Sequence, residues 1–162
     1  MVLRFTKNLA DKLKIKSLPE YDDKVSAFDE WYAHLFTADR IQYILFTNAF
    51  SLYSALFPGK GINDIKTFFE KATYGISVVL REDGFENMIG KFITDKIEII
   101  DICKSNNRGI LGSMNDMVAH SKFYLADYQL TPLEISRKLN EMPYSYLKYK
   151  NPSDVIKAMA IS

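Results

Sequence analysis

The sequence has few of the side chains that most enzymes use for chemistry. Its 162 residues include one cysteine and two histidines. A single cysteine excludes an intrachain disulfide, and two histidines without a close partner in the sequence argue against a zinc site. We interpret His34, His120 and Cys103 as packing or solvent-facing residues. We therefore predict no metal and no cofactor.

Long apolar runs and an excess of charge are also missing. No segment approaches the ~20 apolar residues that a membrane-spanning helix needs, and the charged start is unlike a signal peptide. The net charge is +1 and the basic residues are dispersed, which argues against nucleic acid or an acidic membrane as a partner. We expect one soluble, cytoplasmic domain over residues 1–162.

Aromatic residues, in contrast, are abundant. They make up 14% of the chain, with ten tyrosines and eleven phenylalanines. Most of these rings should fill the core, but tyrosine-rich surfaces are typical of interfaces. The excess predicts a homodimer, and Tyr144, Tyr146 and Tyr149 form a candidate face for a protein partner.

The order of apolar segments predicts an α+β fold. Stretches rich in aromatic and β-branched residues predict strands at 2–5, 31–36, 41–47, 51–57 and 97–103. Short connections join the middle three strands, and the run 41–47 is apolar on both faces, so it should lie centrally.

Helices are indicated by apolar periodicity and by strong start signals. Long helices are expected after Asn63 and after the turn at 106–108, and further helices at Thr131-Pro132 and Asn151-Pro152. The sequence therefore predicts an antiparallel β-meander sheet packed against several helices in a single domain.

The segment from Asn106 to Val118 is the strongest functional signal. It places turn formers, Arg108 and two glycines at the expected start of a helix. Free N–H groups at a helix start, with a guanidinium beside them, are well suited to hold an anion. The run 58–61 (Pro-Gly-Lys-Gly) resembles a fragment of a phosphate-binding loop, although the full pattern is absent.

These features combine into one hypothesis for a ligand site. Three cations would converge on one anion, two asparagines would contact a base or sugar, and an aromatic ring would stack on the base. The structural alternative is that the cations are ordinary surface residues and that the asparagines satisfy backbone groups. The candidate ligand-binding residues are Arg40, Lys60, Arg108, Asn115, Trp31 and Asn48.

The chain also resembles a known family. The resemblance rests on the stretches 31–36 (Trp-Tyr-Ala-His-Leu-Phe), 39–40 (Asp-Arg), 43–48 and 107–116, together with the opening Leu-x-x-Thr-Lys-x-Leu and the closing Asn-x-x-Pro-Tyr-x-x-Leu-x-Tyr. On these residues it is similar to an uncharacterised bacterial family, the domain of unknown function 6933. The family pattern usually has Trp-His-Ala-Asn at 31–34. The resemblance implies a compact α+β domain without an assigned activity.

Three classes of function remain open. The first is a non-catalytic protein that sequesters a small anionic ligand, such as a nucleotide or cyclic-nucleotide signal in a phage or bacterial defence setting. The second is a protein-interaction module of the antitoxin or inhibitor type. The third, a phosphodiesterase or nuclease-like enzyme, is disfavoured because acid–base and metal-binding residues are missing.

Overall fold

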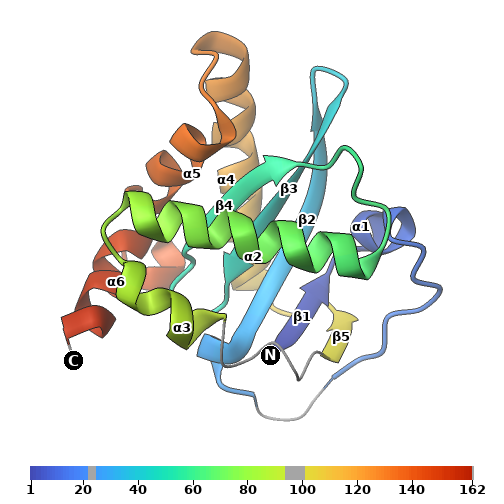
Figure 1. Ribbon diagram of the computed structural model, residues 1–162, viewed down its shortest axis with the longest axis horizontal. Coiled ribbons are helices and arrows are strands. Elements are labelled where there is room, and N and C mark those ends of the chain that lie inside the picture. Colours follow the sequence, from blue (N-terminus) through green and yellow to red (C-terminus); the bar gives the residue numbers. More distant parts are fainter. Residues whose placement is uncertain (22–24, 94–100, 162) are drawn as a thin grey trace.

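The computed structural model describes residues 1–21, 25–93 and 101–161 and shows a five-stranded sheet flanked by helices (Figure 1). The spatial order is β4-β3-β2-β1-β5. The expected α+β class is confirmed. Residues 97–100 of the predicted last strand lie outside the described residues. The strands are β1 (Val2–Phe5), β2 (Glu30–Ala38), β3 (Ile41–Asn48), β4 (Ser54–Pro58) and β5 (Asp101–Lys104).

The sheet is mixed, which corrects part of the predicted topology. Strands β2, β3 and β4 pair antiparallel and form the expected meander. Strand β1, however, lies between β2 and β5 and is parallel to both, with Val2 opposite Glu30 and Asp101. Parallel neighbouring strands need a long connecting segment. One long segment connects β1 to β2, and another precedes β5. The sequence pattern could not reveal this, because a four-residue apolar strand does not specify its direction.

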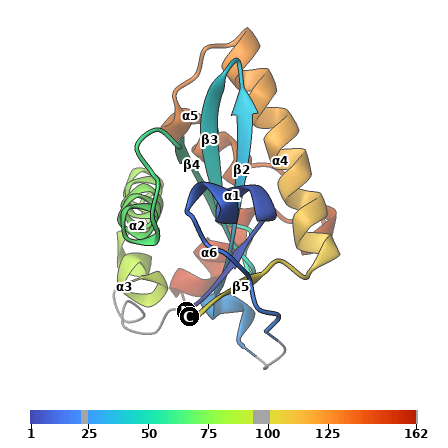
Figure 2. The ribbon, with the colours of Figure 1, turned by 90° about the vertical axis from the view of Figure 1, so that its right-hand side faces the viewer.

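Helices cover both faces of the sheet. In the edge-on view, α2 lies against one face and α4 against the other (Figure 2), and α5 packs at the β4 edge. The helices of the described ranges are α1 (Lys7–Lys12), α2 (Ile65–Glu82), α3 (Ile89–Phe92), α4 (Arg108–Asp127), α5 (Pro132–Asn140) and α6 (Pro152–Ile161).

Strand β3 shows why the sheet needs two covered faces. Successive side chains of a strand point to opposite sides. Ile44 and Phe46 belong to the core on the α2 side, while Tyr43 and Leu45 belong to the core on the α4 and α5 side. All four are buried, so the prediction of a central strand is confirmed.

Short sequence signals predicted where helices α5, α6 and α2 begin. Thr131 and Glu134 form the capping box that the sequence predicted for α5. The amide oxygen of Asn151 accepts the N–H of Asp154 at 2.7 Å at the start of α6. The start of α2 differs from the prediction by one residue. Asp64 is the cap, and the hydrogen bond that its carboxylate accepts from the backbone of Thr67 lowers its pKa.

Helix α5 also closes the free edge of strand β4. The Asn140 side chain accepts the N–H of Ser54 at 2.8 Å and donates to the Ser54 carbonyl at 2.9 Å. The Ser136 hydroxyl accepts the N–H of Leu56 at 2.8 Å. These side chains replace a neighbouring strand, and they protect an edge that would otherwise pair with another chain.

Candidate functional site

Two of the three predicted cations lie at one end of the sheet. Arg40 occupies the turn between β2 and β3, where Asp39 and Arg40 have φ angles of 49° and 66°, as in the two-residue turns that suit hairpins. Lys60 follows β4, and the N–H of Gly59 donates to the Gln42 carbonyl at 2.8 Å. Both side chains are exposed.

Arg108 lies toward the other end of the sheet. The Tyr32 hydroxyl donates to the side-chain oxygen of Asn106 at 2.9 Å, which fixes the start of α4 beside the beginning of β2. From Tyr32 to Ala38 the strand spans about 20 Å, at ~3.3 Å per residue. The structure therefore does not bring Arg40 and Arg108 around one small anion, and Figure 2 shows α4 running the length of the hairpin.

The start of α4 is occupied by the chain's own side chains. The Asn107 side chain accepts the N–H of Ile110 at 3.0 Å. The Tyr146 ring packs on Gly109 so closely that an added Cβ would lie 2.9 Å from its Cδ2 atom. A side chain at position 109 would force this ring to shift. Part of the predicted anion site at this helix start is therefore taken up by the protein's own groups.

Trp31 is not available to stack on a base. Its side chain is 0% exposed. The indole lies parallel to the Phe46 ring, with centroids 4.5 Å apart, and meets the edge of Phe92 at 5.4 Å. A position on a strand that is covered on both faces explains this burial, and Trp31 is a core residue.

The two asparagines also have structural positions. Asn48 is fully buried, and its side-chain oxygen accepts the N–H groups of Phe50 and Ser51 in the turn after β3. It satisfies backbone groups, as the structural alternative proposed. Asn115 is exposed on α4.

The tyrosine cluster near the C-terminus does not form one face. Tyr144 is buried and its hydroxyl donates to the Leu139 carbonyl. Tyr146 packs on Gly109, and Tyr149 is 77% exposed. Only part of this cluster is open to a partner.

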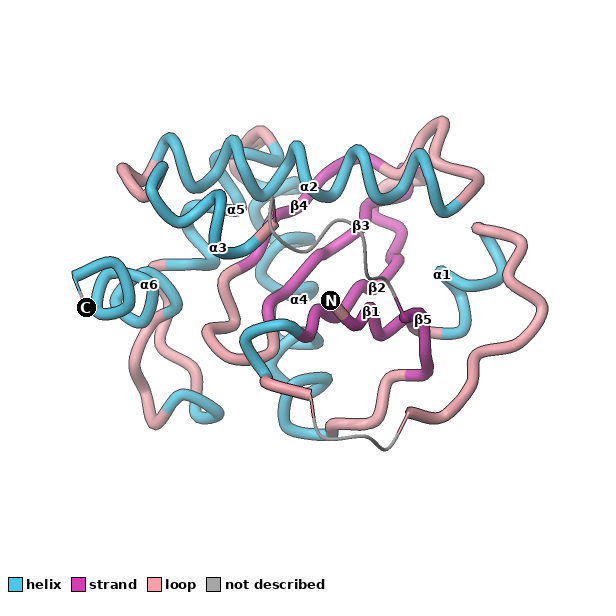
Figure 3. Tube along the Cα trace, turned by 60° about the horizontal axis from the view of Figure 1, so that its bottom comes forward, coloured by secondary structure: helices cyan, strands magenta, loops and turns pink. Residues whose placement is uncertain are grey.

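A more promising location is the place where the neighbouring parallel strands β1 and β5 end. The two strands lie side by side (Figure 3), and Phe5 pairs with Lys104, so both strands end at the same level. Strand β1 leads into α1, whose Leu9 joins the core on the α2 side, whereas β5 leads into α4, whose Ile110 joins the opposite core. The chain thus leaves the two strands toward opposite faces, and a crevice at such a point is where open sheets bind ligands.

A cavity occupies this position, and we call it the switch-point crevice. Its volume of about 460 Å³ lies within the range of small-molecule sites. Three lysines and one carboxylate line it, so the charge favours an anion. The lining residues are Phe5, Thr6, Lys7, Ala10, Asp11, Ile15, Lys16, Ser17, Leu18, Lys104, Ser105 and Leu111.

Two hydroxyl groups of the crevice lack a protein partner. The side-chain oxygens of Thr6 and Ser105 are buried, and neither forms a hydrogen bond within the described residues. Thr6 stands at the cap position of α1, yet its side chain does not cap the helix. A buried polar group without a partner costs about 1–3 kcal/mol, and a polar ligand would remove that cost.

Arg4 of β1 connects chain segments that lie next to the crevice. Its guanidinium donates to the carbonyls of Lys104 and Tyr21, each at 3.0 Å, and its Nε lies 3.5 Å from a carboxylate oxygen of Glu30. Arg4 also lines a cavity of about 250 Å³ that shares Lys104 and Ser105 with the crevice. Because its bonds join the end of β5 to the loop after α1, Arg4 is a positioning residue.

Burial shifts the pKa values of Tyr32, Cys103 and His34 in the direction that favours their neutral forms. Burial, with the charge of Glu30, holds the pKa of Tyr32 well above its usual value. Burial also raises the pKa of Cys103, whose thiol points to the Leu3 carbonyl. Burial lowers the pKa of His34, and the charge of Lys122 adds to this effect. None of these groups is prepared to act as an anionic nucleophile.

Within 1–21, 25–93 and 101–161, no three or more histidine, cysteine, aspartate or glutamate side chains are grouped to hold a metal ion. The same ranges contain no helix with the length and apolar character needed to span a bilayer.

Sequence reasoning did not find Thr6, Lys104 and Ser105. In the sequence, Thr6 has only the features of a helix cap. Lys104 ends a short strand and Ser105 follows it, and the partner of that strand is 99 residues away. The signal that matters is the pairing of β1 with β5, which the sequence does not display.

Comparison with known proteins agrees with the resemblance seen in the sequence. The comparison with curated proteins gives no match. The model of one family, described as domain of unknown function (DUF6933), matches residues 2–155, which is nearly the whole chain. The chain therefore belongs to the DUF6933 family.

Proposed function

We propose that this protein is a non-catalytic binding protein that holds a small anionic ligand in the switch-point crevice. The observation that carries the proposal is that Lys7, Lys16 and Lys104 line one cavity together with Thr6 and Ser105, whose hydroxyls have no hydrogen-bond partner among the described residues. This site replaces the arrangement of Arg40, Lys60 and Arg108 that the sequence suggested.

The chemistry of the crevice suits a ligand with a phosphate and an apolar part. The lysines would neutralise negative charge, and the hydroxyls would donate to phosphate oxygens. Ile15, Leu18 and Leu111 offer an apolar wall for a base or sugar. A nucleotide or cyclic nucleotide has the corresponding size and charge. With Tyr32 and Cys103 held neutral, we expect the ligand to be sequestered intact.

The first test removes the unpartnered hydroxyls. We expect Thr6→Val with Ser105→Ala to weaken binding of adenosine monophosphate or its 3′,5′-cyclic form by roughly tenfold, because two hydrogen bonds to phosphate are lost. The same change should leave the free protein equally stable or more stable, since no protein hydrogen bond is lost. Calorimetric titration and denaturant unfolding measure the two effects.

Charge reversal provides the matched comparison. Lys104→Glu should weaken binding by at least roughly tenfold, whereas Lys157→Glu, the same change on α6, should have little effect. Equal losses from both variants would mean non-specific attraction, and the absence of saturable binding would reject the proposal. Release of a cleaved ligand, seen by mass spectrometry, would favour the enzyme alternative.

The second candidate function, interaction with another protein chain, is favoured by a cluster of aromatic rings on a different surface. Phe123, Tyr124 and Tyr128 form a cluster of rings at the end of α4, with the Phe123 and Tyr128 centroids 5.3 Å apart. Phe123 is 49% exposed and Tyr128 is 60% exposed. Exposed aromatic clusters are typical of interfaces, so this cluster is the proposed contact of the homodimer that the aromatic content predicts.

Light scattering tests the homodimer. We expect a dimer mass at micromolar concentration and a monomer mass after Phe123→Ser with Tyr128→Ser, because the rings supply the apolar contact. Phe50→Ser, at an exposed ring elsewhere, should leave the dimer intact. A monomeric wild-type protein would refute the dimer.

A further inference from the structure

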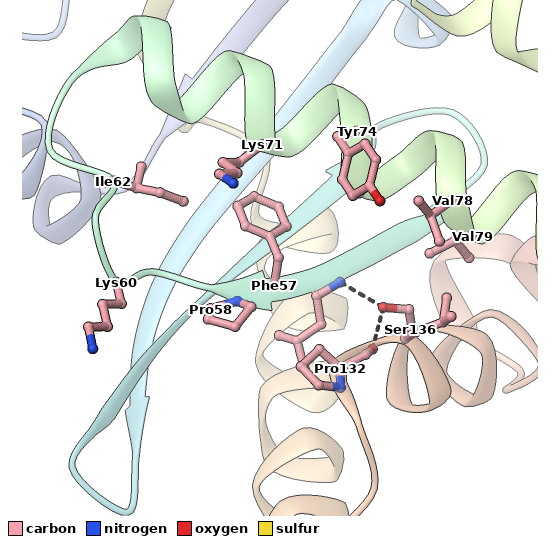
Figure 4. A pocket seen from close by; sticks show the side chains of 13 residues that line it. Phe57, Pro58, Lys60, Ile62, Lys71, Tyr74, Val78, Val79, Pro132 and Ser136 are labelled. Carbon is pink, nitrogen blue, oxygen red and sulfur yellow. Dashed lines mark hydrogen bonds between the residues drawn. The ribbon is translucent and has the colours of Figure 1, made fainter.

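We propose a second binding site that is independent of the switch-point crevice: the groove between α2, β4 and α5 binds an amphipathic carboxylate of the medium-chain fatty-acid class. Figure 4 shows this groove, with α2 above it, strand β4 along its floor and the start of α5 at one side. The argument rests on its lining, its charge, its closed strand edge and its size.

The lining of the groove is mainly apolar. Phe57 lies on the floor, with Val78 and Val79 from α2 and Leu133 from α5 around it. Gly75 of α2 faces the Phe57 ring, and a Cβ at this position would make an ordinary contact with it, 3.4 Å from Cδ1. A surface of this kind is suited to a hydrocarbon chain.

Positive charge is concentrated at one end of the groove. Lys60 and Lys71 lie toward the end where β4 finishes, whereas Val78 and Val79 lie toward the other end (Figure 4). No aspartate or glutamate is among the lining residues, and neither lysine has an ion-pair partner in the described part of the chain. This asymmetry matches a ligand with an apolar body and one anionic head.

The hydrogen-bonding edge of β4 is not open to a peptide strand. The N–H of Leu56 already donates to the Ser136 hydroxyl at 2.8 Å, as Figure 4 shows. Pro58 has no N–H group. A peptide could not extend the sheet here in the usual way, which leaves apolar contact and the lysines as the available attractions.

The volume of the groove limits the length of the hydrocarbon chain that it can hold. The groove has a volume of about 360 Å³ and is open to solvent on one side. At the ~30 Å³ that a water molecule occupies in the liquid, this is room for about a dozen non-hydrogen atoms. Decanoate has this size, with its carboxylate at one end.

Titration of the full chain with decanoate, below its micelle concentration, tests the proposal. We expect saturable 1:1 binding, with amide NMR shifts centred on Tyr74, Val78 and Leu133. Lys60→Ala with Lys71→Ala should weaken binding by roughly tenfold. Lys66→Ala, the same change at an exposed α2 position outside the lining, should not weaken it.

Two further measurements separate the contribution of the carboxylate head to binding from that of the hydrocarbon chain. Decan-1-ol should bind the wild-type protein and the double lysine variant equally, because it has no charge to lose. Val78→Trp should block both ligands, and circular dichroism would verify its fold. Because both lysines are exposed, the double variant remains informative if Val78→Trp fails to fold. The proposal is overturned if decanoate does not saturate, if the lysine changes leave its affinity unaltered, or if the shifts centre on other elements.

Discussion

Arg4→Met is expected to lower the free energy of unfolding by about 3–5 kcal/mol, which is the cost of breaking a buried ion pair by removing one partner. Arg4 is 3% exposed, and its Nε lies 3.5 Å from the Glu30 carboxylate. The methionine would fill much of the space, but Glu30 would be left as a nearly buried charge. The carbonyls of Lys104 and Tyr21 would also lose their donors.

A second ion pair of the same type provides the control. Arg81 lies 3.7 Å from Glu86, but these side chains are 52% and 77% exposed. Because exposed pairs contribute about 0–1 kcal/mol, Arg81→Met should change stability very little. Urea unfolding, with the midpoint and slope compared, measures both variants.

Adding Glu30→Gln to Arg4→Met should recover part of the lost stability, since it removes the uncompensated charge. If the free energy of unfolding of Arg4→Met alone lay within about 1 kcal/mol of that of the wild type, Arg4 would not be required to join β1, β5 and the loop after α1. The crevice would then lack the support that we assign to it.

Local chemistry explains why much of the secondary structure was predictable. The capping box at Thr131 and the cap at Asn151 act within four residues, so the sequence displays them directly. The two apolar faces of residues 41–47 likewise record the two cores that contact β3. Such signals depend only on neighbours along the chain.

Strand direction and the location of the site depend on distant pairing. Val2 lies opposite both Glu30 and Asp101, and no periodicity in a four-residue strand specifies these partners. The crevice exists because that pairing brings Thr6 beside Ser105. The same limit applies to Trp31 and Arg108, because the residue types do not reveal that Trp31 is buried or that Arg108 lies far from Arg40.

Asn140→Ala is expected to lower the free energy of unfolding by about 2–6 kcal/mol, because it leaves two buried backbone groups without partners at about 1–3 kcal/mol each. The amide of Asn140 serves both the N–H and the carbonyl of Ser54, and both residues are 0% exposed. Alanine cannot replace either bond, and water reaches this part of the edge only if α5 moves away.

Loss of this contact should have a second, visible consequence. With α5 loosened, the β4 edge can pair with another molecule, so Asn140→Ala should aggregate during unfolding at lower temperature than wild type. Asn115→Ala, at an exposed position on α4, should change stability by less than about 0.5 kcal/mol and leave aggregation unchanged. Urea unfolding and static light scattering on heating measure the two effects. If Asn140→Ala had the same stability and the same aggregation temperature as Asn115→Ala, the side-chain hydrogen bonds of α5 to β4 would contribute nothing measurable. The packing of α5 alone would then have to protect the edge of β4.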